Sequence, residues 1–215
     1  MFRNRAEAAR LLVRRFKGRD LRDPLVLAIP RGGVVTGAVL ARELHAELDV
    51  VLARKLRAPG RPELAIGAVS EDGQVYFNPL AKPLLELEAE YIAGERAHQL
   101  DEITRRKALF RAVRPQAPME GRSVIVTDDG IATGSTMIAA LEVAHARKPF
   151  ELIVAVPVAS PDRLPEIRVR CDEVICLLAP SSFWAIGQFY EDFSQVEDSE
   201  ALDLLRAGAP AQNLA

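Results

Sequence analysis

SVIVTDDGIATGST, which runs from Ser123 to Thr136, is the stretch that decides the fold of this chain. Val124, Ile125 and Val126 form an apolar, β-branched run that predicts a strand buried on both faces. Two adjacent carboxylates follow the run, and after them comes a turn rich in glycine and hydroxyl groups. An Ala-rich segment with helical periodicity begins at Met137. Strands that alternate with helices along the chain predict an α/β fold with a mostly parallel central sheet flanked by helices.

The turn after this strand has the composition of an anion-binding site. Ser135 or Thr136 is expected to cap the following helix, whose N-terminus offers unpaired N–H groups and the positive end of its dipole. Backbone N–H groups from Ile131 onward are expected to surround a phosphate. The carboxylates of Asp128 and Asp129 are expected to accept charge-assisted hydrogen bonds from two sugar hydroxyls. The stretch therefore predicts a ligand with a phosphate at one end and a diol beside it.

Two common phosphate-binding motifs do not fit this turn. A nucleoside-triphosphate P-loop needs a lysine before its final Ser or Thr, whereas Gly134 directly precedes Ser135 here. A dinucleotide fingerprint needs a third glycine, and its acidic residue lies after the loop and not before it. An ordinary strand-turn-helix corner with solvated aspartates stays open as an alternative.

At these residues the sequence resembles the type I phosphoribosyltransferases. The signature of that family for phosphoribosyl pyrophosphate (PRPP) is a hydrophobic strand, two acidic residues and a glycine/threonine loop. The resemblance implies transfer of a phosphoribosyl group from PRPP to a nucleobase-like acceptor, with release of pyrophosphate. It also implies Mg²⁺, bound mainly through PRPP and water and without dedicated protein ligands. The implied PRPP-binding residues are Asp128, Asp129, Gly130, Ile131, Ala132, Thr133, Gly134, Ser135 and Thr136.

A second corner of the same kind lies upstream, at Pro30-Arg31-Gly32-Gly33. It joins a predicted strand at 25–29 to a predicted helix at about 34–44. Glycine allows a tight turn and close approach of the backbone to a ligand, and Arg31 supplies a fixed positive charge. The resemblance implies that Arg31 and Gly32 bind pyrophosphate, in a loop that often contains a non-proline cis peptide.

A pair of basic residues, Arg54 and Lys55, follows a predicted strand at 49–53. Residues that leave the C-terminal end of a strand point toward the crevice where α/β sheets bind ligands. Related transferases use similar pairs on pyrophosphate, although solvated cations at a strand end would look the same. The implied catalytic residues are Asp128, Asp129, Arg31 and Lys55, and the implied pyrophosphate-binding residues are Arg31, Gly32, Arg54 and Lys55.

Between these motifs and the strand at 124–126, the sequence predicts a peripheral unit. A flap at about 56–80 contains a short strand and an Asp72-Gly73 hairpin turn into a second strand at 75–77. A long, charged helical insertion at about 83–113 is expected to pack on the flap or to contact a second copy of the chain. Its basic cluster at 105–107 is interpreted as a solvated face. We expect the whole chain, 1–215, to form one domain.

The C-terminal stretch 181–193 holds five of the twelve aromatic residues of the chain. Phe183, Trp184, Phe189 and Tyr190 follow the last predicted strand, at 171–178, and therefore lie near the crevice. A flat acceptor would gain about 1–3 kcal/mol by stacking on such a ring. Phe183 and Tyr190 are the candidate acceptor-binding residues, whereas Trp184 is expected in the core. Aromatic residues that only seal the core are the alternative.

Composition narrows the function further. The 215 residues carry a formal net charge of −2, so a broad basic surface for nucleic acid is not indicated. No apolar run approaches the length of a membrane span, and two cysteines are too few for a disulfide framework. We expect a cytoplasmic protein that acts on small molecules and can form a homodimer. A non-catalytic, regulatory protein that binds PRPP or nucleotides on the same fold stays open as the alternative function.

Overall fold

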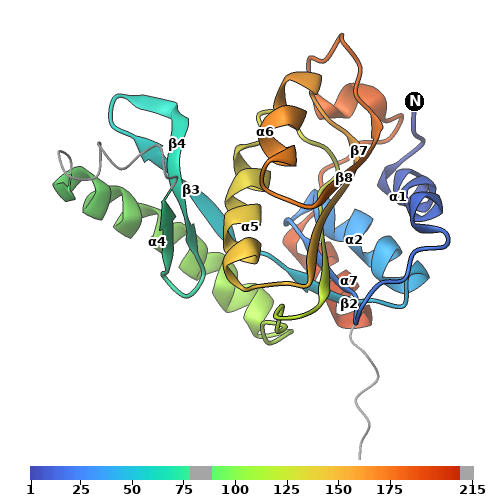
Figure 1. The fold of residues 1–215 in the computed structure, drawn as a ribbon, viewed down its shortest axis with the longest axis horizontal. Helices are drawn as coiled ribbons and strands as arrows, with labels where there is room; N and C mark the ends of the chain where they lie inside the picture. Colours follow the sequence, from blue (N-terminus) through green and yellow to red (C-terminus); the bar gives the residue numbers. More distant parts are fainter. Residues whose placement is uncertain (78–88, 209–215) are drawn as a thin grey trace, which may run out of the picture.

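A computed structural model describes residues 1–77 and 89–208 (Figure 1). Its main sheet has the strand order β2-β1-β6-β7-β8, and every neighbouring pair is parallel. These strands are β1 (Leu25–Ala28), β2 (Glu47–Val50), β6 (Ser123–Thr127), β7 (Glu151–Val158) and β8 (Glu173–Leu178). The α/β fold with a mostly parallel sheet is therefore confirmed.

Helices cover both faces of the main sheet (Figure 1). α1, α2 and α7 pack on one face, and α5 and α6 pack on the other. The bounds are α1 (Arg5–Val13), α2 (Gly32–Glu43), α5 (Ser135–Ala146), α6 (Leu164–Arg168) and α7 (Asp198–Ala207), with short 3₁₀ turns at Arg14–Phe16, Pro161–Arg163 and Ile186–Phe189. None of the described helices is both long enough and apolar enough to cross a membrane.

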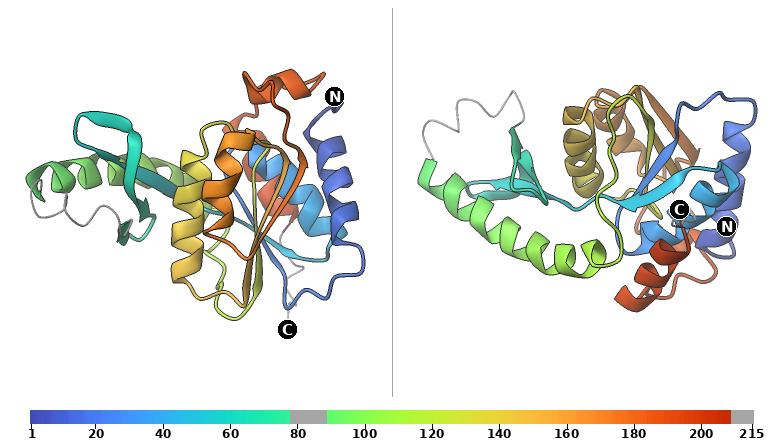
Figure 2. Two further views of the ribbon diagram at one scale, coloured as in Figure 1. Left: turned by 45° about the horizontal axis from the view of Figure 1, so that its top comes forward. Right: turned by 90° about the horizontal axis from the view of Figure 1, so that it is seen from below.

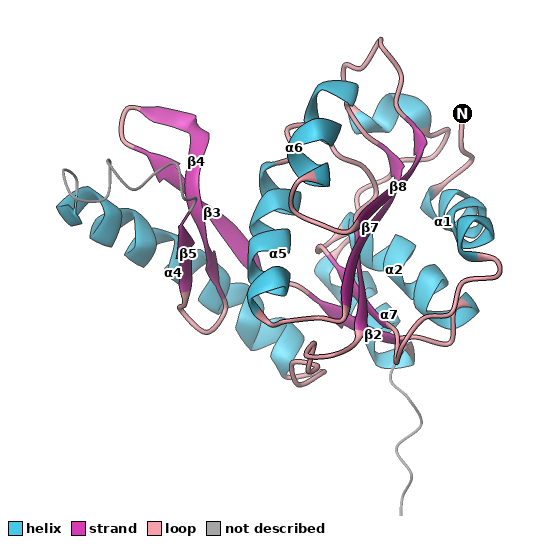
Figure 3. Cartoon of the chain, in the orientation of Figure 1, coloured by secondary structure: helices cyan, strands magenta, loops and turns pink. Residues whose placement is uncertain are grey.

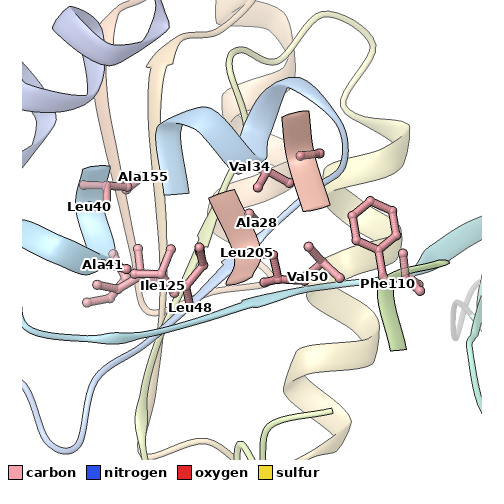
Figure 4. Packing of buried hydrophobic residues seen from close by; sticks show 14 of the residues in the cluster. Ala28, Val34, Leu40, Ala41, Leu48, Val50, Phe110, Ile125, Ala155 and Leu205 are labelled. Carbon is pink, nitrogen blue, oxygen red and sulfur yellow. The ribbon is translucent and has the colours of Figure 1, made fainter. Parts of the chain in front are cut away.

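Alternation along the strands divides the core into two layers. Val26 and Ile125 are register partners on the α1/α2 side, and Leu27 and Val126 are partners on the α5 side. All four are fully buried, because both faces of the sheet are covered. Figure 4 shows the α1/α2 layer, which Phe110 joins from a distant helix.

A second, smaller sheet projects from the main one together with a long helix (Figure 2). Its strands are antiparallel in the order β3-β4-β5, shown in magenta in Figure 3. We call this unit the hood; it comprises β3 (Ala53–Ala58), β4 (Arg61–Ser70), β5 (Val75–Phe77) and α4 (Ala89–Arg111). The predicted flap strands, the turn and the helix are thus observed, and α4 packs on β3 and β4. Residues 78–80 of the predicted flap and residues 83–88 of the predicted helical insertion lie outside the described residues.

The predicted C-terminal end of the core strand at 49–53 is wrong. β2 ends at Val50, and Ala53 begins β3, which belongs to the hood sheet. The chain crosses from one sheet to the other through Val51 and Leu52, which are each 5% exposed. Because the crossing is buried, the apolar run continues through it, and hydrophobic pattern alone does not reveal the break. The basic pair therefore stands at the start of a hood strand.

Candidate active site

The two predicted corners meet at the C-terminal edge of the adjacent strands β1 and β6. A Cβ on Gly32 would lie 2.0 Å from Oδ2 of Asp129, and a Cβ on Gly33 would lie 3.0 Å from Cα of Asp128. Glycine at both positions lets the two corners pack this closely, because an added Cβ would have to displace the Asp129 carboxylate or the main chain at Asp128. The peptide bond between Pro30 and Arg31 is cis, as the resemblance implied.

A small cavity of about 150 Å³ lies at the N-terminus of α5, against the predicted phosphate loop. Gly134 precedes the helix with φ of +76°, a left-handed conformation that other residues adopt only with strain. The cap is thus Gly134 and not Ser135 or Thr136, because the turn needs this backbone conformation more than a hydroxyl acceptor. The cavity is lined by Asp128, Gly130, Ile131, Ala132, Thr133, Gly134, Thr136, Met137 and Ile186.

Not every N–H group of the loop faces this cavity. The N–H of Ile131 donates to the carbonyl of Val158 at 2.9 Å, and the Ile131 carbonyl accepts from Ser160 at 2.8 Å. Ile131 therefore ties the loop to the end of β7, which corrects the expectation that its N–H binds phosphate. The N–H groups from Ala132 to Thr136 donate to no protein acceptor among the described residues. These groups are available to an anion at the helix N-terminus.

The two signature aspartates have different surroundings. Asp128 lines the cavity and is half-buried. Asp129 is 8% exposed, and its Oδ2 lies 2.7 Å from Nε of Arg5, on the side of the other corner. One carboxylate thus faces the small cavity, and the other is paired with Arg5. Burial and then the charge of Asp129 raise the pKa of the Asp128 carboxyl well above its ordinary value.

Arg5 holds Asp129 from the N-terminal helix. Its guanidinium donates to the Ser194 carbonyl at 2.9 Å and lies 3.9 Å from the centroid of the Phe193 ring. The Tyr190 hydroxyl donates to the Asp129 main-chain carbonyl at 2.6 Å. Residues near the N-terminus and residues of the C-terminal region thus together hold Asp129 in place. Sequence reasoning missed Arg5, because no local pattern separates it from the other arginines of an amphipathic helix.

The aromatic residues are placed differently from the prediction. Trp184 is 87% exposed, whereas Tyr190 is 5% exposed and packs between Phe2 and Phe193. A parallel bridge between Phe2 and Tyr190 draws this tyrosine into the core, and burial raises the pKa of its hydroxyl. Its ring is therefore not open to an acceptor. Phe183 packs on Phe189 and does not line the small cavity.

A larger cavity of about 390 Å³ separates the hood from the loop; we call it the hood cavity. Arg54 and Lys55 both line it, as do Thr133 and Thr136, which also line the smaller cavity. Nζ of Lys55 lies 3.5 Å from Oγ of Ser135. The basic pair therefore reaches the phosphate loop although its strand belongs to the hood.

Arg31 lies in a third hollow, of about 440 Å³, together with Arg5 and Gly32. Its guanidinium is 3.8 Å from the carboxylate of Glu197, the N-cap of α7, and 3.9 Å from that of Asp198. The residues expected to bind pyrophosphate thus line two different hollows. Pro30 and Arg106 line both of them. The 105–107 cluster is exposed, as predicted, and the side chain of Arg106 also lines both hollows.

Comparison with known proteins agrees with this architecture. Residues 3–194 match the model of the phosphoribosyl transferase domain. The chain is 43% identical to a Thermus thermophilus protein of known crystal structure, TT1426; the alignment covers 97% of this chain and 99% of the other, with a TM-score of 0.92. It is also 38% identical, over 95% of its length, to a Mycobacterium tuberculosis protein named "Putative phosphoribosyl transferase", of which it spans 46%. The chain belongs to the phosphoribosyl transferase family.

Proposed function

We propose that this chain transfers a phosphoribosyl group from PRPP to an acceptor and releases pyrophosphate. The observation that carries the proposal is the cavity at the N-terminus of α5, which shares Thr133 and Thr136 with the hood cavity. A phosphate in the small cavity would meet free N–H groups and the positive end of the helix dipole. A ribose that extends past the two threonines would then present its reacting carbon to the hood cavity.

The remaining groups suit the other parts of PRPP. Asp128 lines the small cavity, so its carboxylate would accept hydrogen bonds from the ribose hydroxyls. Asp129 would act from behind, because Arg5 holds its carboxylate at 2.7 Å. The leaving pyrophosphate would be bound by Arg31, Gly32, Arg54 and Lys55.

The reaction needs positioning and electrostatics more than covalent catalysis. A lone pair on the acceptor would form a bond to the ribose carbon C1 while the bond from C1 to the pyrophosphate oxygen breaks. The electron pair of the broken C1–O bond would leave with pyrophosphate. Fixed cations stabilise charge that develops on the leaving group, and the Asp128 carboxylate lies on the side of the electron-poor ring. A proton on the acceptor nitrogen would pass to solvent.

We propose that Mg²⁺ is bound mainly through PRPP and water, as the resemblance to the family implies. Among residues 1–77 and 89–208, no three His, Cys, Asp or Glu side chains gather in the way that a protein-held metal requires. Mg²⁺ keeps several waters and commonly binds through substrate phosphates with few protein ligands. When bound, the ion would offset the negative charge of the pyrophosphate group.

Titration calorimetry with ribose 5-phosphate, and with PRPP and Mg²⁺, tests the phosphate assignment. Gly134→Val should abolish most of the affinity, because valine cannot adopt φ of +76° without moving the loop. Gly18→Val is the matched control, since Gly18 has φ of +80°, has open space around it and lies outside all three hollows. Equal affinity in the Gly134 variant and the parent would refute the loop assignment.

Pyrophosphate release separates the transferase from the regulatory alternative. The transferase should release pyrophosphate from PRPP in the presence of its acceptor. Arg31→Ala should slow this release more than it weakens binding of a nucleoside monophosphate, which lacks the pyrophosphate group. Tight PRPP binding without release, across a broad acceptor panel, would favour the regulatory protein.

A further inference from the structure

Two cationic side chains of the hood cavity have no role in the proposed binding of PRPP. Arg57 reaches the cavity from β3, and Arg106 reaches it from α4. The nearest carboxylate to Arg57 is that of Glu95, at 3.8 Å, and Arg106 approaches the Pro30 carbonyl at 3.4 Å. Both contacts are long for hydrogen bonds, so most guanidinium N–H groups of the two residues are available to a ligand.

The charge of the cavity wall is strongly positive. Among the described residues that line it, Arg54, Lys55, Arg57 and Arg106 are cations, and Glu102 is the one carboxylate. Glu102 is itself paired with Arg105, outside the cavity. A cavity with unneutralised guanidinium groups attracts anions, and Arg binds carboxylate and phosphate groups with two parallel hydrogen bonds.

The apolar part of the wall does not offer a stacking surface. None of the described lining residues is aromatic; the apolar side chains are aliphatic, as at Ile29 and Ile103. Gln99 adds an amide that is 1% exposed and accepts from Arg54 at 3.0 Å. A neutral, flat base would therefore find no ring to stack on among these residues, while an anionic group would find several donors.

We propose that the acceptor for the hood cavity is a small molecule with an anionic group, a carboxylate or a phosphate, which Arg57 and Arg106 bind. This inference rests on the proposed function, because PRPP in the loop would direct its reacting carbon toward this cavity through Thr133 and Thr136. The volume of about 390 Å³ is within the range of small-molecule sites and leaves room for a compact acceptor. Charge, and not base stacking, then selects the acceptor.

Matched pairs of probes test the inference by calorimetry. The protein is first saturated with a non-reactive carbocyclic analogue of PRPP and Mg²⁺, so that the pyrophosphate site is filled. Nicotinate is then compared with nicotinamide, orotate with uracil, and phenyl phosphate with phenol. In at least one pair the anion should bind about 10-fold tighter or more, which corresponds to one charge-assisted contact. The first two pairs report on carboxylates, and the third pair reports on phosphates.

Variants locate the preference in the cavity. Arg57→Gln and Arg106→Gln should each weaken the anionic probe about 10-fold and leave its neutral partner unchanged. Arg42→Gln is the control, because this arginine of α2 has a side chain that is 66% exposed, pairs with Glu43 and lines none of the three hollows. Thermal unfolding of each variant checks that the hood is intact.

Every outcome bears on the inference. No anionic preference in any pair, including no binding of any anionic probe, would overturn it, as would a preference that survives in both the Arg57 and Arg106 variants. If the carbocyclic analogue itself does not bind the parent protein, the proposed function fails. Binding of the analogue without an anionic preference would reject the acceptor class alone.

Discussion

The ligand corner, residues 30–33 and 128–136, and the hood are held in place by different kinds of contact. The corner is set by the main chain: Gly32 packs on a carboxylate, Gly134 turns the loop, and Ile131 pairs with the end of β7. The hood is anchored by apolar packing, to which Phe110 contributes, and also by ionic side chains. Arg111 of α4 contacts Asp49 of the main sheet at 2.7 Å and Glu71 of the hairpin at 2.6 Å.

This difference predicts where each region is sensitive. Main-chain contacts leave no room for added atoms, so the corner should fail when a glycine gains a side chain. Long side chains span gaps and tolerate changes in spacing, so the hood should fail when a central ion is removed. In the hood that ion is Arg111, which also donates to the main-chain carbonyls of Val50 and Arg114.

The largest expected effect comes from Arg111→Met. Asp49 is fully buried, so the variant leaves a carboxylate without its counter-ion and should lower the free energy of unfolding by about 3–5 kcal/mol. Burial already raises the pKa of Asp49, against the opposing charge of Arg111. Chemical denaturation at neutral pH measures the loss. Arg105→Met, on the exposed face of α4, is the control and should change the stability by less than about 0.5 kcal/mol.

The pH dependence tests whether an unpaired carboxylate, such as that of Asp49, causes this loss. A carboxyl whose native pKa is above its unfolded value destabilises the fold increasingly as the pH rises through the interval between the two values. Without Arg111 the native pKa should rise further. The deficit of Arg111→Met should therefore shrink as the pH is lowered from 7 toward 5. A deficit independent of pH would mean that lost packing, and not the unpaired charge, causes it.

A smaller loss of stability, but a larger loss of ligand binding, is expected for Gly32→Ala. The new methyl group would lie 2.0 Å from Oδ2 of Asp129, so the Asp129 side chain must leave its contact with Arg5 or the two corners must separate, at a cost of about 1–3 kcal/mol. Affinity for ribose 5-phosphate should fall at least about 10-fold, an effect of about 1.4 kcal/mol. Gly94→Ala is the control in the hood helix, where nothing lies within 4 Å. It should stabilise the protein by about 0.5–1 kcal/mol and leave the affinity unchanged.

The third prediction separates stability from binding at Asp128. Burial and the charge of Asp129 raise its native pKa, so its ionisation above the ordinary value of 3.8 destabilises the fold. Asp128→Asn should therefore raise the stability at pH 7 by on the order of 1 kcal/mol, and the gain should vanish at low pH. The same variant should lose its preference for ribose 5-phosphate over the dideoxy analogue. Unfolding curves at several pH values measure the change in stability, and calorimetry measures the preference.

Asp72, in the hood, has a pKa shift opposite in sign to that of Asp128. Partial burial acts to raise its pKa, but hydrogen bonds from Ser70 and Arg147 outweigh it, and the pKa is lowered overall. Asp72→Asn should therefore lose a stabilisation that the parent has at neutral pH and that disappears as the pH falls. A neutral-pH gain in this variant, or a loss in Asp128→Asn, would contradict the assigned shifts.

The smallest effect is expected at Trp184. Its side chain is 87% exposed, so Trp184→Ala should change the free energy of unfolding by less than about 0.5 kcal/mol. Tyr190→Phe is the contrast, because it removes the hydroxyl that donates to the Asp129 carbonyl at 2.6 Å and should cost about 1–3 kcal/mol. A large loss at Trp184 in thermal unfolding would mean that the chain buries this ring in solution.

The parts of the fold that the sequence predicted well are those whose cause is local. Buried parallel strands appear as continuous apolar runs, and the hairpin has its Asp72-Gly73 turn. The phosphate loop is one uninterrupted segment, so its glycines and its helix start are visible together. The break between β2 and β3 was missed, because Val51 and Leu52 are buried at a crossing between two sheets.

By itself, then, the sequence determined the sheet class, the loop at 128–136 and the glycine corner at 30–33, because each follows from the residues of one short segment. Tertiary structure alone decided which side chains converge on them. Arg5 reaches Asp129 across 124 positions, and Arg106 reaches Pro30 across 76. Such contacts depend on how distant elements pack, and an arginine has the same local pattern whether it ends in solvent or in a cavity.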